Sequence, residues 1–227
     1  MDIFQLTALM LTAVWFWEII VFRRSRIMLV GGLVVIGLYT LAAILFGEAV
    51  PEELGLSGMI SWPQTIVLAL AGLAVTLAYS PIADRIASRW FPEPPNLEAF
   101  QTLQKSKTNL ILGIAATWVL GGILEELTAR GIVLTSLHSL LSMSLSDVPA
   151  AAIAIIITGA GAGAVHLYQG KRAMVIVTQI SILFGVLFVV SGYNLMTVII
   201  CHGLYDTVAF VRFAGGRSRH SKTATDT

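Results

Sequence analysis

The chain has 227 residues, of which 56% are hydrophobic and 12% are charged, and its formal net charge is +1. A soluble domain carries about 25% charged residues, so this composition excludes an ordinary soluble globular protein. The small net charge gives no indication of a nucleic-acid partner, and the single Cys201 excludes an intrachain disulfide. We therefore expect an all-α, integral, multi-pass membrane protein whose first partner is the lipid bilayer.

Seven apolar segments are predicted to be transmembrane helices, because about 20 apolar residues cross a hydrocarbon core of about 30 Å. They lie near residues 3–22, 27–46, 65–83, 109–128, 149–168, 173–190 and 194–212. The first is followed by its basic cluster and lacks a small-residue cleavage site, so we expect a retained span and not a cleaved signal peptide. The sequence thus predicts a single transmembrane domain over 1–227 with about seven helices, the last four of which enclose a polar intramembrane cavity.

Basic residues alternate between the connecting segments. They are Arg23, Arg24 and Arg26, then Arg85, Arg89, Lys105 and Lys107, then Lys171 and Arg172, and finally Arg212, Arg217, Arg219 and Lys222. The intervening loops 47–64 and 131–148 carry no Lys or Arg. Because Lys and Arg prefer cytoplasmic loops, we expect an external N-terminus and a cytoplasmic C-terminus in the plasma membrane of a prokaryote. The Gly-, Ser- and Thr-rich tail over 214–227 is predicted to be disordered.

Several ionisable residues fall within or beside the apolar segments, where a charge at the bilayer centre costs roughly 2.5–3.5 kcal/mol. They are Glu18, Glu125, Glu126, Arg130, His166, His202 and Asp206. Glu18 lies between two tryptophans and is predicted to be interfacial. The other six indicate a functional site, because such residues usually face a cavity or pair with one another.

Helical spacing arranges some of these residues in pairs. Glu126 and Arg130 are four residues apart, so they can form an ion pair on one face of a helix. His202 and Asp206 have the same spacing. Glu125 points about 100° away from Glu126, which leaves one glutamate paired with arginine and the other free to face a cavity.

Three short motifs contain these six residues in order: "EELTAR" at 125–130, "AGAVHLYQG" at 162–170 and "HGLYD" at 202–206. The first fits the pattern E-E-x-x-x-R. Together they resemble the CPBP family of CAAX proteases and bacteriocin-processing enzymes, also called the Abi family, and its type II CAAX prenyl endopeptidases. The resemblance covers a core of roughly residues 109–212. Three motifs in order within apolar segments are fairly specific, although each one alone is weak.

The resemblance implies hydrolysis of a peptide bond inside the membrane, in a membrane-associated substrate such as a prenylated CAAX tail or a bacteriocin precursor. A glutamate and two histidines can also activate water and stabilise an oxyanion. We assign Glu125 as the general base and His166 as the residue that helps to hold the water. His202 and Asp206 would stabilise the oxyanion, and the predicted ion pair would hold the site's structure.

Three alternatives remain open at this point. Glu125, His166 and His202 could bind zinc, although H-E-x-x-H is absent, and we favour water activation without a metal or any other cofactor. The chain could instead be a non-catalytic scaffold that binds partners with a protease fold. It could also be an ion- or proton-coupled transporter, although paired broken helices in two repeated halves are missing.

Two motif positions are smaller than is usual for the family. Ala129 stands where the first motif often has Phe, and Ala162 stands where the second usually has an aromatic residue. The smaller side chains at these two positions are expected either to widen the cavity or to indicate a divergent member of the family with a different substrate.

The predicted spans place Glu125 near the outer end of the fourth helix and His166 near the cytoplasmic end of the fifth. Because catalysis needs them within reach of one water, either the fourth helix extends to about residue 140 or the fifth is displaced and broken at its glycines.

The topology predicts that cysteines introduced at residues 50 and 218 lie on opposite sides of the membrane. Labelling of intact cells with a membrane-impermeant maleimide should therefore modify the first position and spare the second. Labelling of both positions from the same side would contradict the predicted orientation.

Overall fold

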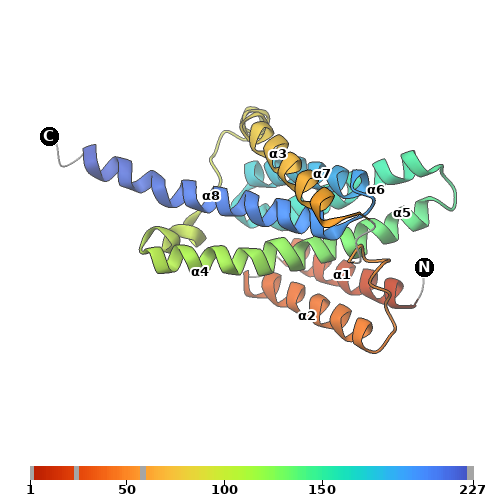
Figure 1. The fold of residues 1–227 in the computed structure, drawn as a ribbon. Helices are drawn as coiled ribbons and strands as arrows, with labels where there is room; N and C mark the ends of the chain where they lie inside the picture. The colour runs from red at the N-terminus through yellow and green to blue at the C-terminus, as the bar shows by residue number, and fades with distance from the viewer. Residues whose placement is uncertain (1–2, 23–25, 57–59, 224–227) are drawn as a thin grey trace.

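The computed structural model describes residues 3–22, 26–56 and 60–223, and all regular elements in these ranges are helical (Figure 1). They are α1 (Ile3–Phe22), α2 (Arg26–Leu45), α3 (Trp62–Trp90), η1 (Glu98–Gln104), α4 (Lys107–Thr117), η2 (Trp118–Glu125), η3 (Leu127–Leu134), α5 (Thr135–Leu141), α6 (Asp147–Val165), η4 (His166–Gln169), α7 (Lys171–Val190) and α8 (Leu195–Thr223). Among the short elements, η1 and η4 are 3₁₀ helices, and η2 and η3 are π-helices. The predicted all-α class is confirmed.

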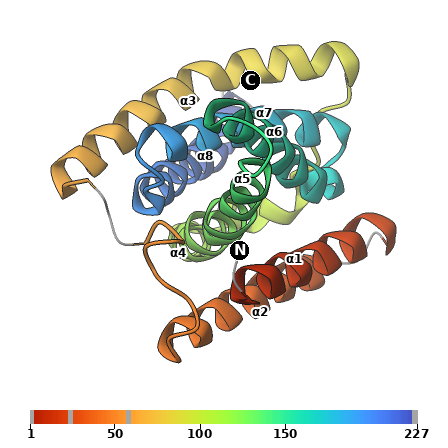
Figure 2. The same cartoon turned by 90° about the vertical axis from the view of Figure 1, so that its right-hand side faces the viewer.

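The helices are arranged in three layers (Figure 2). α3 packs on α7 and α8 on one side, and the α1–α2 pair packs on η2, η3 and α6 on the other. Two apolar clusters hold the layers together, one containing Leu134, Phe188 and Val198, and the other containing Ile36 and Ile132. Because η3 contributes to both clusters, the segment that carries the E-E-x-x-x-R motif lies between them.

In the described part of the chain, six helices are long and apolar enough to cross a membrane. They are Met28–Leu45, Trp62–Trp90, Lys107–Leu141, Asp147–Gln169, Lys171–Val190 and Leu195–Gly216. α1 is apolar but shorter over its described part, Ile3–Ile19. Large apolar side chains face outward, among them Leu38, Val67 and Ile111, which are 61%, 64% and 65% exposed and can contact lipid. The protein is an integral multi-pass membrane protein, and the count of seven spans stays a prediction.

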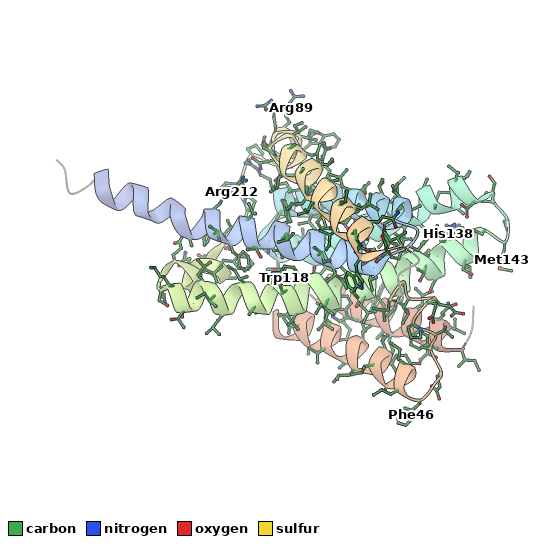
Figure 3. All side chains as sticks on the ribbon, in the orientation of Figure 1. Phe46, Arg89, Trp118, His138, Met143 and Arg212 are labelled. Carbon is green, nitrogen blue, oxygen red and sulfur yellow. The ribbon has the colours of Figure 1, made fainter. Side chains whose placement is uncertain are left out.

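The two ends of the chain lie far apart. α1 begins and α8 ends at opposite ends of the molecule (Figure 1), and Figure 3 places His138 and Met143 toward one end and Arg212 toward the other. The orientation in the membrane stays a prediction. α8 continues to Thr223, so it includes much of the tail that was expected to be disordered, and residues 224–227 lie outside the described ranges.

The fourth predicted span is longer than expected. α4, η2, η3 and α5 follow one another as a single helix, Lys107–Leu141, which we call the central helix. α6 runs unbroken through its glycines to Val165. Of the two alternatives, the extension of the fourth helix to about residue 140 is therefore correct, and the predicted break of the fifth helix at its glycines is wrong. A π-helix is rare and occurs mostly as a single-turn bulge, frequently at functional sites, so two such segments around the motif are notable.

Close packing of α8 on the central helix requires the glycine at position 203. A Cβ there would stand 2.6 Å from the ring of Trp118, which lies between α8 and the central helix (Figure 3). The Nε1 atom of Trp118 donates to Thr207 Oγ1 at 3.1 Å. We expect Gly203→Ala to destabilise the fold by about 1–3 kcal/mol, the usual cost of overpacking, measured by unfolding in mixed detergent micelles. Gly31→Ala is the matched control, because nothing lies within 4 Å of its added Cβ. Equal stability of the two variants would contradict this packing.

Candidate active site

A pocket of about 470 Å³, here called the active-site pocket, opens between the central helix and its neighbours. Its polar lining includes Glu125, Arg130, His166, Ser181, His202 and Asp206, which come from η2, η3, η4, α7 and α8. Residues of α2 and η1 complete its walls, so more than the last four helices form it. Five of the six residues predicted for the site line this pocket, and the sixth, Glu126, is completely buried.

The completely buried Glu126 joins three helices. Its Oε1 accepts hydrogen bonds from Arg130 Nη1 at 3.0 Å and from His202 Nδ1 at 2.6 Å. Arg130, only 3% exposed, also donates from Nη2 to the Ser181 carbonyl oxygen and hydroxyl, each at 2.6 Å. The predicted ion pair is therefore present, and it connects the central helix to α7 and α8.

The His202 ring is oriented from several sides. Its Nε2 lies 3.5 Å from Asp206 Oδ2, which accepts a 2.6 Å hydrogen bond from the Thr117 hydroxyl. A Cβ at Gly121 would be only 3.1 Å from Asp206 Oδ2, so the missing side chain lets this pair approach the central helix. Phe184 packs against the ring with centroids 5.0 Å apart. Nδ1 is bonded to Glu126, so a ligand could reach the ring only at Nε2, which it would share with Asp206.

Glu125 and His166 have fewer partners. Within the described ranges, no hydrogen bond or ion pair engages the Glu125 carboxylate, which is partly exposed to the pocket and interacts electrostatically with His166 and His202. His166 follows the last residue of α6, and its Nδ1 bonds to the Ala162 carbonyl oxygen at 2.8 Å. His166 Nε2 is thus the nitrogen available to a water. The two glutamates differ as the sequence predicts, one paired and one facing a cavity.

The donor set was also tested against the zinc hypothesis. Across the described ranges, no group of three or more His, Cys, Asp or Glu residues is arranged to hold a metal ion. Glu125, His166 and His202 share a pocket without meeting that arrangement, and the Glu126 carboxylate already engages His202 Nδ1. In this arrangement Glu125, His166 and His202 do not fit a zinc ion. Whether the activity depends on a metal stays a prediction.

A second pocket of about 520 Å³ lies between α1, η3 and α6, and we call it the apolar groove. Glu125, Arg130 and His166 line this groove as well as the active-site pocket. Ala129 and Ala162, the two positions expected to be larger in the family, both line the groove. The small side chains therefore border open space beside the site.

Sequence reasoning did not find three residues that organise the site. Ser181 holds Arg130, Thr117 holds Asp206, and Phe184 packs on His202 and lies with its ring centroid 5.7 Å from Arg130 Cζ. The only signal in the sequence was a hydroxyl or an aromatic ring within an apolar span. That signal is weak because such hydroxyls often bond to a carbonyl of their own helix.

The buried network predicts a large cost for removing one of its charges. Glu126→Gln would leave Arg130 buried without a counter-charge, which typically lowers the free energy of unfolding by about 3–5 kcal/mol. The double variant Glu126→Gln with Arg130→Met should recover much of this loss. The control is Asp84→Asn. The Asp84 carboxylate accepts two hydrogen bonds from Arg172, at 2.8 and 2.7 Å, but the Asp84 side chain is 47% exposed, and solvent-exposed pairs are typically worth only about 0–1 kcal/mol. Equal losses of unfolding free energy in Glu126→Gln and Asp84→Asn would contradict the buried pair.

Comparison with known proteins agrees with this geometry. Residues 107–208 match a family model described as Rce1-like, type II CAAX prenyl endopeptidase Rce1-like. The match contains all three motifs and falls within the core expected at 109–212, apart from two residues at its start. No curated protein and no solved structure gives a match. A region similar to the Rce1-like family of type II CAAX prenyl endopeptidases therefore spans residues 107–208, and this similarity suggests a protease of the membrane.

Proposed function

We propose that the protein is an intramembrane endopeptidase that hydrolyses a peptide bond of a membrane-associated substrate with water activated by Glu125. The observation that supports this most is the convergence of Glu125, His166 and His202, from three helical segments, on one pocket. Nothing local in the sequence brings these residues together. The Rce1-like match independently favours a hydrolase.

Glu125 has the properties of a general base. Its carboxylate faces the pocket without a partner in the described ranges, so it can accept a proton from a water held between it and His166. The oxygen of that water bonds to the carbonyl carbon of the scissile peptide, and the carbonyl π electrons move onto its oxygen. The proton on Glu125 then passes to the leaving nitrogen as the C–N bond breaks, which gives an acid and an amine.

His202 is placed to stabilise the oxyanion. With Nδ1 bonded to Glu126, a hydrogen on Nε2 can be donated to the developing negative charge, and Asp206 orients the ring from the same helix. Preorganised donors in a site that excludes water are often the largest contribution to catalysis. Glu126, Arg130 and Ser181 do not touch the substrate in this scheme and act as positioning residues.

The family similarity and the apolar surroundings of the site support a membrane-associated substrate. A prenylated CAAX-type tail or a bacteriocin-type precursor would reach the site from the bilayer, which surrounds the apolar outer faces of the helices. With the predicted orientation, the basic C-terminal end of the chain would face the cytoplasm of a prokaryote.

The test is Glu125→Gln, which keeps the shape of the side chain but removes the base. We expect it to lower cleavage by a factor of roughly 10²–10⁴, the usual contribution of a general base, with unchanged thermal stability. Comparative membrane proteomics of cells with the wild type and the variant should show a peptide that accumulates uncut, and purified protein in liposomes should cleave it.

The matched control is Glu52→Gln, the same change at an exposed glutamate in a loop. It should cleave the accumulated peptide at the wild-type rate. Wild-type cleavage by Glu125→Gln would contradict the assigned base. If the variant still binds partners and the wild type cleaves nothing, the scaffold alternative is correct.

A further inference from the structure

A third pocket, of about 590 Å³, lies at the ends of several membrane spans, and we call it the interfacial pocket. Its lining includes the residues at or next to the end of Trp62–Trp90 and of Asp147–Gln169, and the first residues of Lys171–Val190. Ile19 and Leu29, where the apolar part of α1 ends and that of α2 begins, form part of its apolar wall. The pocket therefore lies at the depth where the hydrocarbon core of the bilayer meets the polar headgroups.

The other wall of the interfacial pocket is charged, and two of its three charges have no counter-charge. Arg172 is engaged, because its Nε and Nη2 donate to the two carboxylate oxygens of Asp84 at 2.8 and 2.7 Å. Among the described residues, no hydrogen bond or ion pair engages the side chains of Glu93 and Lys171. Lys171 Nζ lies 5.8 Å from the centroid of the Phe91 ring, which also lines the pocket. One cation and one anion, not paired with each other, thus remain for a ligand.

This combination of walls matches a zwitterionic phospholipid better than a peptide or a free anion. A lipid phosphate complements Lys171, an ethanolamine ammonium complements Glu93, and acyl chains complement the apolar wall that adjoins them. Basic pockets between membrane helices are known to hold lipid headgroups. An extended peptide would find few backbone partners on the loop side, because Pro92 and Pro94 have no N–H and the Pro92 carbonyl oxygen already accepts from Arg172 at 3.2 Å.

We propose that the interfacial pocket is a binding site for a phospholipid with a phosphoethanolamine headgroup. Lys171 donates to the phosphate, Glu93 accepts from the primary ammonium, and the acyl chains lie against Ile19, Leu29 and the end of α6. The inference does not rest on the proposed function, because binding is measured without cleavage. None of these four residues lines the apolar groove, and only Leu29 also lines the active-site pocket.

The test is native mass spectrometry of the full chain in detergent micelles, titrated with dioleoyl lipids that differ only in their headgroup. Phosphatidylethanolamine should bind at least about threefold more tightly than phosphatidylcholine, whose quaternary ammonium donates no hydrogen bond, and than phosphatidylglycerol, which has no ammonium. Lys171→Gln should lower the affinity for all three lipids by about threefold to tenfold, a value between those of exposed ion pairs and of hydrogen bonds to charged groups. Glu93→Gln should lower only the affinity for phosphatidylethanolamine, so that the preference is lost.

Two matched controls carry the same changes outside the pocket. Lys107→Gln alters an exposed lysine that is likewise the first residue of a membrane-spanning helix, and Glu98→Gln alters an exposed glutamate of the same connecting segment as Glu93. Both should bind the three lipids as the wild type does. Ile19→Trp narrows the apolar wall without changing a charge, so it should weaken all three lipids. The unfolding temperature in lipid-free detergent verifies that each variant is folded.

Four outcomes would overturn the inference. Equal affinity for the three lipids would exclude the headgroup assignment, and an equal loss in Lys107→Gln and Lys171→Gln would show unspecific attraction to the basic surface. If glycerophosphoethanolamine without acyl chains binds as tightly as the lipid, the occupant is a soluble molecule. If a peptide with a free C-terminal carboxylate displaces the lipid, and Lys171→Gln abolishes binding of that peptide, the pocket holds the end of a peptide and not a lipid.

Discussion

The arrangement of the site depends on one buried ion pair inside a membrane helix. Glu126 and Arg130 are almost completely inaccessible to solvent, and an unpaired charge at this depth would cost several kcal/mol (roughly 2.5–3.5 on an insertion scale). The guanidinium is satisfied only when α7 brings Ser181 to it, and the carboxylate only when α8 brings His202. The requirement to pair these charges therefore determines where three helices meet, and His202 of α8, the proposed oxyanion donor, is positioned as a consequence.

The network is not fully satisfied within the described ranges, since Glu126 Oε2 and Arg130 Nε have no hydrogen-bond partner there. Partly satisfied buried pairs are poor stabilisers, because the desolvation penalty can exceed the Coulombic gain. The presence of the Glu126–Arg130 pair is better explained by its role in positioning His202 than by a contribution to stability. The π-helical segments on either side of Glu126 fit this view.

Sequence reasoning identified the charged residues that the structure brings together, but not their supporting contacts. A charge in an apolar span is conspicuous, and the i, i+4 spacing of Glu126 with Arg130 and of His202 with Asp206 fixes a shared face whatever the tertiary fold. The hydroxyl of Ser181 could not be assigned to Arg130, because the two are 51 residues apart and only the packing of α7 brings them together. Fold class followed from composition, since continuous apolar windows leave few alternatives to membrane helices.

Helix boundaries were less predictable. Apolar periodicity does not distinguish an α-helical turn from a π-helical one, so nothing in the run around Gly121 and Gly122 indicated that hydrogen bonds change register there. The same limitation concealed the length of the central helix. Its polar residues after Arg130 resemble a loop, although Leu134 and Ser136 are buried by tertiary packing. The end of a span was therefore placed where hydropathy falls, while the helix continues to Leu141.

Under the proposed function, the two pockets would allow hydrolysis to take place beside a hydrophobic substrate segment at this depth. A peptide bond can be attacked only where water is present, yet an apolar substrate segment leaves the bilayer only for an environment that is similarly apolar. The polar lining of the active-site pocket and the apolar groove separate these requirements, and Glu125 and His166 border both. A bond held at that border would contact the activated water on one side while the adjoining side chain stays out of water on the other. Charges that develop there interact more strongly than in bulk water, because the surrounding dielectric is low.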